Sequence, residues 1–287
     1  MRHTTLHVGG PADAMIFPDR PDRVERLIAL CTDLEVPVFP LGRGSNLLVR
    51  DEGIRGVVLA TDRLNAFRLE DGRIEAWAGF TLGGLAVRSS RAGFVGLEFA
   101  AGVPGSVGGG VFMNAGAHGG QMAEHVRKVG FLPLRQGEER LFAASSELEV
   151  LGQEECAFAY RESVFQHRPG VVLWAELALT PGDAEESRRR LREFQAERRA
   201  RQPLAWPNCG SVFRNPPGDH AGRLVEAVGG KGRRIGRAQI SERHGNFIVN
   251  LGGATASDVL NLIDWAREAV LRTFGIELEL EIRVVPA

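Results

Sequence analysis

Several features that mark specialised proteins are scarce or missing in this sequence. Its 287 residues include three cysteines, Cys31, Cys156 and Cys209, which lie far apart and show neither a metal-ligand spacing nor the density of a disulfide framework. No apolar run approaches the roughly 20 residues of a membrane-spanning helix, and the opening residues MRHTTLHVGG contain no signal-peptide core. We therefore expect a protein of the reducing cytoplasm, with no metal site and no membrane partner.

Net charge and lysine are equally scarce. The formal charge at pH 7 is −1, and no basic tail or stripe interrupts the balance of 35 basic and 36 acidic residues. This distribution lacks the electrostatic footprint of a protein that binds nucleic acid. All but two of the basic residues are arginine, the exceptions being Lys128 and Lys231. Because arginine is the usual cation of this chain, a single arginine is weak evidence for an anion site.

Glycine, in contrast, is abundant and clustered. Eight of the 36 glycines fall between Gly96 and Gly119, in a segment whose main polar residues are Ser106, Asn114 and His118. Glycine loses much conformational entropy when it is fixed, so this density needs a physical reason. Backbone N–H groups that turn inward form an anion site, and a following helix N-terminus reinforces it. We predict a phosphate-binding loop that leads into a short buried helix. The alternative is that the glycines allow tight turns to pack two elements together.

A second glycine-rich loop lies in the segment LGRGSNLLV, from Leu41 to Val49. It departs from the dinucleotide-binding pattern G-x-G-x-x-G, because Leu47 stands at the third glycine position and no long helical pattern follows. This difference disfavours a Rossmann NAD(P) enzyme. A strand–loop–strand arrangement fits better, with Ser45 and Asn46 supplying polar atoms, although a simple hairpin turn would look the same. Taken together, the two segments predict a pair of loops that hold one pyrophosphate.

Hydrophobic periodicity predicts strands and helices that alternate without a strict parallel βαβ rhythm. The predicted strands lie within residues 3–17, 36–40, 56–59, 66–69, 73–78, 126–134, 171–179, 247–250 and 276–284. The predicted helices are one that Asp22 caps, followed by 81–91, 181–201, 220–228 and 255–274. The pattern is clearest in the last helix, where apolar residues recur at 3.6-residue spacing and Gly275 provides the stop. Pro203 and Pro207 mark a domain boundary after the charged helix.

Three polar residues outside the loops could take part in chemistry, although each has a simpler explanation. Arg161 lies in a polar turn beside the only tyrosine, Tyr160, where a surface arginine is the simpler interpretation. Ser211 follows Gly210 without a G-x-S-x-G elbow or a signal for a histidine base, so it fits a proton donor or a capping residue better than a nucleophile. Glu281 belongs to the polar face of an alternating strand, where a solvated carboxylate is expected.

Seen together, these segments resemble one family of bacterial flavoenzymes. The resemblance is carried by HTTLHVGGPAD, PLGRGSNLLVRDEGIRGVVL, GLEFAAGVPGSVGGGVFMNAGAHGG, FAYRES, QPLAWPNCGSVFRNPPGDHAGRLVE and IELELEIRVV. In this order they span nearly the whole chain and are similar to the UDP-N-acetylenolpyruvoylglucosamine reductase family, which is also called the UDP-N-acetylmuramate dehydrogenase family. As a set, the motifs are highly specific.

The resemblance implies an α+β chain with a vanillyl-alcohol-oxidase-type FAD-binding fold. Two α+β FAD-binding subdomains, at residues 1–62 and 63–202, would precede a C-terminal α/β substrate-binding domain at residues 203–287. Both glycine-rich loops would hold FAD noncovalently. The implied cofactor-binding residues are Gly42, Arg43, Gly44, Ser45, Asn46, Leu47, Pro104, Gly105, Ser106, Gly109, Asn114, Gly116 and His118.

The family reduces UDP-N-acetylglucosamine enolpyruvate to UDP-N-acetylmuramate in peptidoglycan precursor synthesis, with NADPH as the reductant. Its reduced flavin passes hydride from N5 to C3 of the enolpyruvyl ether, and its three catalytic positions map onto Arg161, Ser211 and Glu281. Arg161 and Glu281 would polarise the substrate carboxylate. Glu281 can do so only if it is protonated or paired with Arg161, so we expect a raised pKa for its carboxyl beside the substrate. Ser211 would give a proton to C2.

The sequence differs from the family pattern in two places. The longer N-terminal lead is missing, and a loop with a substrate-clamping tyrosine is not evident. We predict Gln202, Asn215 and His244 as contacts of the small-molecule substrate, and we expect a monomer. Two other functions compete with the reductase: another FAD oxidase or dehydrogenase of the same superfamily, and a binding-only module for nucleotide sugars. Acid-releasable FAD would argue against the covalently tethered oxidases, and a yellow protein would exclude the binding-only module.

Overall fold

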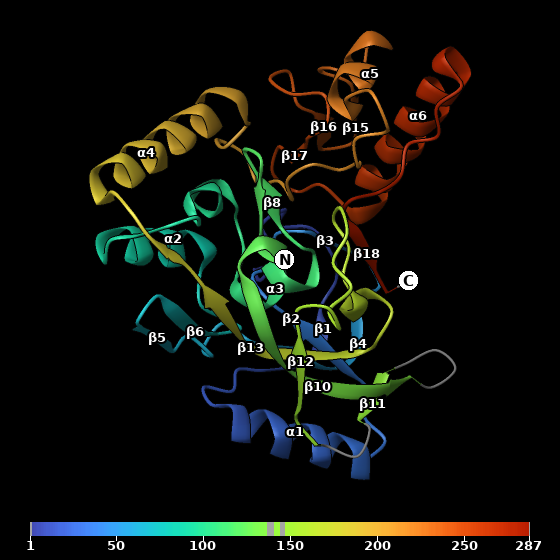
Figure 1. Cartoon of the computed structure of the whole chain (residues 1–287). Helices are drawn as coiled ribbons and strands as arrows, with labels where there is room; N and C mark the ends of the chain where they lie inside the picture. Colours follow the sequence, from blue (N-terminus) through green and yellow to red (C-terminus); the bar gives the residue numbers. More distant parts are fainter. Residues whose placement is uncertain (1, 137–140, 144–146, 287) are drawn as a thin grey trace. The chain divides into compact units, whose positions relative to one another are not determined.

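The computed structural model describes residues 2–136, 141–143 and 147–286 (Figure 1). Contacts between residues divide the chain into two compact units. Unit 1 draws on residues 1–11, 44–54 and 197–287, and unit 2 on residues 12–43 and 55–196. Each unit is therefore assembled from segments that are separated in sequence. The division into three domains expected from the sequence remains a prediction, because contact density alone does not test it.

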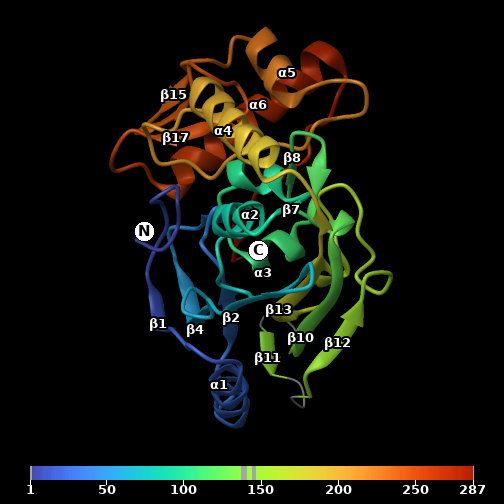
Figure 2. The same cartoon turned by 60° about the vertical axis from the view of Figure 1, so that its left-hand side comes forward.

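Unit 2 contains a six-stranded antiparallel sheet with the strand order β11-β10-β13-β6-β5, in which β12 also pairs with β10. The strands are β5 (Phe67–Glu70), β6 (Arg73–Trp77), β10 (Val126–Gln136), β11 (Leu141–Ala143), β12 (Glu149–Gly152) and β13 (Gly170–Ala178). The long strands β10 and β13 lie side by side in Figure 2. A three-stranded sheet, in the order β1-β4-β2, contains β1 (Ala12–Ile16), β2 (Val38–Leu41) and β4 (Ile54–Ala60). The predicted strands from residue 36 to residue 179 are confirmed, with ends that differ by at most two residues.

Helix α1 (Pro21–Asp33) starts earlier than its predicted cap. Its N-cap is Arg20, and Pro21 occupies the first turn. Proline is favoured there because its fixed φ suits a helix and its missing N–H would have no intrahelical partner. The prediction that Asp22 caps this helix is therefore wrong. Asp22 lies inside the first turn, where its carboxylate still interacts favourably with the helix dipole.

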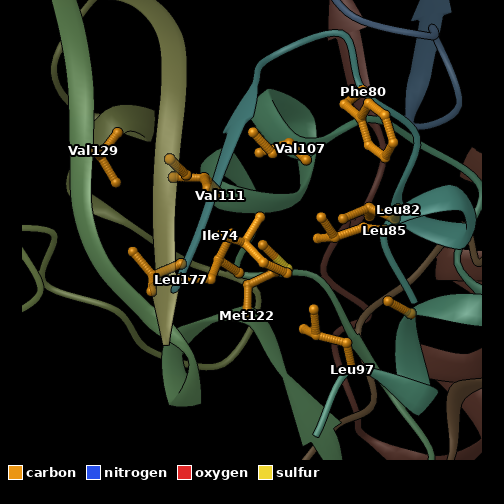
Figure 3. Packing of buried hydrophobic residues seen from close by; sticks show 14 of the residues in the cluster. Ile74, Phe80, Leu82, Leu85, Leu97, Val107, Val111, Met122, Val129 and Leu177 are labelled. Atoms are coloured by element: carbon orange, nitrogen blue, oxygen red, sulfur yellow. The ribbon is translucent and has the colours of Figure 1, made fainter. Parts of the chain in front are cut away.

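The six-stranded sheet is covered on both faces. On one face pack α2 (Leu82–Arg91) and α3 (Val107–Phe112), whose side chains meet those of Ile74, Val129 and Leu177 (Figure 3). The opposite face, which includes Leu173, packs against α1 together with residues of β2 and β4. Strand β13 thus contributes to two separate cores, with Val172, Ala175 and Leu177 in the first and Val171 and Leu173 in the second. The strict alternation of a strand is interrupted after Leu173, where the register between β10 and β13 shifts. Thr81 caps α2 by accepting a hydrogen bond from Gly84 N, so the predicted start of that helix is confirmed.

Helix α4 (Ala184–Arg201) is largely solvated, as predicted from its charge run. Only Ser187 and Leu191 are buried, and Glu186 forms ion pairs with Arg189 and Arg190 along the exposed surface. The short elements are β7 (Phe94–Val95), η1 (Glu98–Gly102), β8 (Gly116–Ala117), β9 (Gly120–Gln121), η2 (Met122–Glu124), η3 (Val164–Gln166) and β14 (Thr180–Pro181). None of the helices in the described part of the chain is long and apolar enough to cross a bilayer.

Unit 1 is organised around α6 (Ala256–Phe274), the helix that the sequence indicated most clearly. Thr255 and Asp258 form a capping box at its start, and Gly275 adopts a left-handed conformation (φ 68°) at its end. The apolar face of α6 packs with α5 (Ala221–Ala227) and with a three-stranded sheet. That sheet has the order β15-β16-β17 and consists of β15 (Arg234–Ile235), β16 (Ala238–Ile240) and β17 (Ile248–Asn250).

The last predicted strand is wrong over most of its length. Between residues 276 and 284 the sequence predicts a continuous strand, but only β18 (Arg283–Val285) is one, and it pairs in parallel with β3 (Leu47–Val49). The preceding residues keep the predicted alternation of exposure, with Leu278 and Ile282 buried and the intervening glutamates less buried. Alternation needs only an extended backbone, whereas a ladder needs a regular partner strand. The partner here is an irregular loop, which makes a single bridge between Phe213 and Leu280.

Candidate active site

The clearest sign of a ligand site in unit 2 is the hydroxyl of Ser106, directly before α3. Ser106 is 1% exposed, and within the described part of the protein its Oγ has no hydrogen-bond partner. A Cβ added at Gly42, in the other glycine-rich loop, would lie 3.0 Å from this oxygen. The two loops therefore meet at Ser106. A buried hydroxyl without a partner costs about 1–3 kcal/mol, and a ligand with polar oxygens at this point would remove that cost.

The glycines of α3 serve two different purposes. A Cβ at Gly108 would lie 2.9 Å from the Cβ of Ala78, and one at Gly110 would lie 3.0 Å from the side chain of Leu82. These two glycines allow α3 to pack closely on β6 and α2, which is the alternative explanation left open by the sequence. Gly109 differs, because it is exposed and its Cβ would meet only the Ser106 Oγ, at 3.8 Å. Packing does not require glycine at this position.

Alanine substitutions of two neighbouring glycines distinguish a glycine needed for helix packing from one that leaves room for the cofactor. Gly109→Ala should stabilise the FAD-free protein by about 0.5–1 kcal/mol, because alanine is the better helix former, yet weaken FAD binding at least tenfold if the backbone there approaches the cofactor. Gly108→Ala should instead lower the melting temperature of the FAD-free protein, because its Cβ would clash with Ala78. Thermal unfolding and FAD titration of both variants test this. Equal FAD affinity in Gly109→Ala and the parent would remove Gly109 from the proposed site.

The second half of the first glycine-rich loop belongs to unit 1. The boundary between the units falls between Arg43, which is exposed, and Gly44. Gly44 has φ 60°, and a Cβ there would lie 2.4 Å from the carbonyl oxygen of His3. Asn46 donates from Nδ2 to the carbonyl oxygen of Glu281 (3.0 Å) and accepts from Arg283 N (2.9 Å). The loop is therefore fixed to the extended segment that carries Glu281, directly before β18, and the following Leu47 begins β3.

The end of the longer glycine-rich segment forms a hairpin, β8–β9, whose predicted cofactor residues already have protein contacts. Asn114 is fully buried with φ 41°, and its amide donates to the carbonyl oxygen of Ala159 (2.7 Å) and to Gln121 Oε1 (3.1 Å). The ring of His118 stacks on Phe194 of α4, with 4.0 Å between centroids. For Asn114 in particular, these bonds indicate a structural contribution to the loop. Pro104 and Gly105 precede Ser106 in the same segment.

Arg161 lies at the tip of a tight turn in unit 2. Ala159 and Glu162 exchange both of their backbone hydrogen bonds across the turn (3.1 and 3.2 Å), and Arg161 has φ 56°. The Nη2 atom of Arg161 donates to the carbonyl oxygen of Gly116 in β8 (2.7 Å), and its guanidinium lies 5.0 Å from the ring of Tyr160. The predicted catalytic arginine is thus partly buried against one of the predicted cofactor segments.

Ser211 and Glu281 are brought together in unit 1, although 70 residues separate them in sequence. The carbonyl oxygen of Val212, the residue after Ser211, accepts a hydrogen bond from Glu281 N (2.9 Å). Burial raises the pKa of the neighbouring Cys209 thiol to about 12, so it is a packing residue and not a nucleophile. The structure therefore gathers Ser211, Glu281 and Asn46 from three distant segments.

Asn246, which the sequence analysis did not identify, fixes the backbone next to Ser211. Its Oδ1 accepts from Phe213 N and its Nδ2 donates to Phe213 O, both at 2.8 Å, while its own carbonyl oxygen accepts from Val212 N (2.9 Å). The residue is 4% exposed. Gln166 has a similar relation to Arg161, whose carbonyl oxygen it binds. No spacing in the sequence links either amide to its partner, so only the folded backbone reveals them.

The three predicted substrate contacts lie in unit 1 and each has a protein partner. Asn215 accepts a hydrogen bond from Ala221 N (3.1 Å) at the start of α5, and Gln202 accepts one from Arg198 Nε (3.0 Å). His244 accepts from Asn246 N through Nδ1 (3.1 Å), which leaves its proton on Nε2 in the neutral ring. Burial lowers the pKa of His244, so the neutral form dominates near pH 7. Their contact with a substrate remains a prediction.

Comparison with known proteins identifies one family, through a model of its C-terminal domain and through relatives that span the whole chain. A family model for the C-terminal domain of UDP-N-acetylenolpyruvoylglucosamine reductase matches residues 202–285, and one for an FAD binding domain matches residues 12–139. The chain is 49% identical to the UDP-N-acetylenolpyruvoylglucosamine reductase of Heliobacterium modesticaldum, over 99% of this chain and 88% of that protein. It is 44% identical to that of Bacillus subtilis, over 99% of this chain and 91% of the relative.

A solved structure agrees with these matches. The crystal structure of the UDP-N-acetylenolpyruvylglucosamine reductase from Thermus caldophilus superposes with a TM-score of 0.82 at 37% identity, covering 99% of this chain and 96% of that one. The predicted α+β class, the vanillyl-alcohol-oxidase-type FAD-binding fold and FAD as the cofactor are confirmed. The chain therefore belongs to the UDP-N-acetylenolpyruvoylglucosamine reductase family, a family of FAD-dependent oxidoreductases.

Proposed function

We propose that this chain catalyses the NADPH-dependent reduction of UDP-N-acetylglucosamine enolpyruvate to UDP-N-acetylmuramate, a step of peptidoglycan precursor synthesis. Besides family membership, one structural observation gives the strongest support for this proposal. The segment after Ser211 is hydrogen-bonded to Glu281, and Asn46 of a glycine-rich loop binds the same Glu281 backbone. The backbone segments that carry Ser211, Glu281 and Asn46 thus meet within one compact unit. Segments with a hydroxyl and a carboxyl side chain that meet in this way support a site for proton transfer.

The residues around Ser106 fit the cofactor. FAD, when bound, supplies the hydride that it has accepted from NADPH. The buried Ser106 hydroxyl can donate to a phosphate or ribityl oxygen, and Gly42 and Gly109 leave room beside it. We propose that these residues and the remaining members of both loops hold FAD noncovalently. Asn114 and His118 would act by shaping the β8–β9 hairpin, because their side chains already contact Ala159 and Phe194.

Arg161 would bind the substrate carboxylate and stabilise the negative charge that develops on it when C3 accepts hydride. Its guanidinium is permanently charged and can bind a carboxylate through two parallel hydrogen bonds. The Gly116 carbonyl holds one end of it before any substrate arrives, and such preorganisation is worth several kcal/mol in a site without water. Glu281 would assist as a protonated acid or as the partner of Arg161.

Ser211 would donate the proton that C2 requires. A serine hydroxyl is a weak acid in water, so it can protonate carbon only when the acceptor is a strong base held within reach. The carbanion-like C2 is a strong base. The hydrogen bonds of Asn246 to the backbone of Val212 and Phe213 fix the chain next to Ser211, which supports holding its hydroxyl within reach of C2. The proton that Ser211 loses would be replaced from solvent after product leaves.

The substrate is a small molecule, and we propose Gln202, Asn215 and His244 as its further contacts. We also propose that the protein is a monomer of the cytoplasm. The location is supported by three cysteines that are all unpaired and buried, as is common in a reducing compartment.

Spectroscopy of the purified protein tests this function. We expect a yellow protein whose flavin passes into the supernatant on acid precipitation, and two separable phases in stopped flow: bleaching by NADPH and recovery of colour on adding the enolpyruvyl substrate. The control is the same substrate without its enolpyruvyl group, which should restore no colour. A colourless protein that cannot be reconstituted with FAD would instead support a binding-only module. Flavin that stays with the precipitate would contradict noncovalent binding.

A further inference from the structure

The turn that carries Arg161 adopts a conformation that arginine does not favour. Arg161 has φ 56°, in the left-handed region, where the Cβ of an L-residue is crowded by the following carbonyl oxygen. The reciprocal backbone bonds between Ala159 and Glu162 close the turn, and one of them uses Glu162 N, the N–H of the peptide that follows Arg161. The carbonyl oxygen of that planar peptide points the opposite way, so it needs a contact of its own.

That contact comes from Gln166, the last residue of η3. Its Nε2 donates to the carbonyl oxygen of Arg161 (2.9 Å) and to the carbonyl oxygen of Phe112 (3.1 Å). A side-chain amide has two N–H groups, so both are used. Phe112 ends α3, the helix that begins directly after Ser106. One amide therefore ties the Arg161 backbone to the helix that the cofactor loop leads into.

The arginine is also held at its other end by the chain that leaves α3. Its Nη2 donates to Gly116 O (2.7 Å), and Asn114, two residues earlier, donates to Ala159 O (2.7 Å). Backbone and guanidinium are thus fixed to the same stretch of chain, residues 112–116. All these residues belong to unit 2. If the contact from Gln166 to the Arg161 carbonyl is lost, the position of the guanidinium is less constrained by its own backbone.

We propose that Gln166 is a positioning residue for Arg161: by holding the Arg161 carbonyl it keeps the guanidinium where the substrate carboxylate binds. The inference rests on the proposed role of Arg161. Gln166 itself touches no reacting group in this scheme. Its side-chain amide links the end of α3 to the turn of Arg161 through hydrogen bonds to Phe112 O and Arg161 O. A shorter or apolar side chain cannot form both of these hydrogen bonds.

Gln166→Met tests the proposal, because methionine is of similar length, uncharged and unable to donate. In stopped flow we expect flavin reoxidation by the enolpyruvyl substrate to slow on the order of 10- to 100-fold, because a misplacement of a catalytic group by about 1 Å can cost about 100-fold in rate. Flavin reduction by NADPH should be unchanged. Ser163→Ala is the matched control, since Ser163 Oγ also donates to Phe112 O (2.7 Å) but not to Arg161. Equal slowing in both variants would trace the effect to α3 anchoring and overturn the proposal.

A readout without turnover is available because the chain has one tyrosine, Tyr160, beside Arg161 in the turn. Labelling with 3-fluorotyrosine places a single ¹⁹F resonance there. We expect Gln166→Met to shift or broaden this resonance in FAD-loaded protein at an unchanged melting temperature. Gln153→Met removes a side-chain hydrogen bond from Gln153 Nε2 to Ala123 O elsewhere in unit 2. This variant should leave the ¹⁹F resonance unchanged. An unaltered resonance in Gln166→Met would overturn the proposal.

A double-mutant comparison separates this inference from the proposed function. In an Arg161→Ala background, Gln166→Met should slow reoxidation no further, because the residue that it positions is gone. If Arg161→Ala alone leaves reoxidation unchanged, the proposed role of Arg161 fails. If Arg161→Ala slows it and Gln166→Met does not, the proposed function stands and only the positioning role is wrong.

Discussion

Ser211→Ala should leave the reduction of bound FAD by NADPH nearly unchanged while slowing its reoxidation by the enolpyruvyl substrate on the order of 10²- to 10⁴-fold, the usual contribution of a general acid. The asymmetry follows from the proposed role, since a proton donor to C2 is needed only after hydride has reached C3. Removing the hydroxyl should not disturb the fold, because the backbone of the next two residues is held by Asn246 and Glu281. Stopped-flow absorbance of the two half-reactions measures both rates.

Two further serine variants complete this experiment. Ser211→Cys retains a weak acid and should fall between the parent and the alanine variant in reoxidation rate. Ser257→Ala removes an exposed hydroxyl from the same unit, at the start of α6, and should change neither half-reaction. If Ser211→Ala slowed both half-reactions equally, the hydroxyl would have a role in cofactor binding and the proton-donor assignment would be lost.

Arg161→Ala should have the second large effect, a slowing of reoxidation on the order of 10²- to 10³-fold, comparable to the loss of one oxyanion-stabilising group. Arg161→Lys keeps the charge but loses the planar fork that binds a carboxylate with two bonds, so we expect an intermediate rate. Both variants should also bind the enolpyruvyl substrate more weakly, which a titration of the oxidised protein would show. Flavin reduction by NADPH is the internal reference.

Arg188→Ala is a suitable control for the arginine variants, since Arg188 is exposed on α4 and its Nε bonds only its own helix, at Ala184 O. Its kinetics should match those of the parent. Reoxidation at the parent rate in Arg161→Ala would show that another cation meets the carboxylate, and the assignment of Arg161 would have to be abandoned.

The elements that the sequence predicts best are those whose signal is local. The Thr255–Asp258 capping box and Gly275 define α6 from within the helix and its ends, and the glycine pattern before Val107 indicates a short buried helix. Two local predictions fail because the structure there depends on neighbouring residues or segments. Arg20 and Pro21 begin α1 ahead of Asp22, and the strand expected before β18 faces an irregular loop that offers one bridge.

The residues of the proposed site could be predicted from the sequence, whereas the residues that hold them in place could not. Arg161 and Ser211 stand in motifs, so a family resemblance proposes them. Gln166 and Asn246 act through amides that bind backbone atoms, and a hydrogen bond to a carbonyl leaves no pattern in the partner's sequence. Likewise, nothing in the sequence separates Gly109 from Gly108 and Gly110, because the difference lies in which atoms a Cβ would meet.

The discontinuity of unit 1 constrains the order in which the chain can fold as it is made. A ribosome will have synthesised all of unit 2 before it reaches residues 197–287. Until then Leu6, Val8 and Leu48, which are fully or almost fully buried in the finished unit, have no α6 to pack against. Unsheltered apolar side chains of this kind are what chaperones bind during translation. Residues 1–11 and 44–54 would thus reach their final place only after residues 197–287, which are synthesised later.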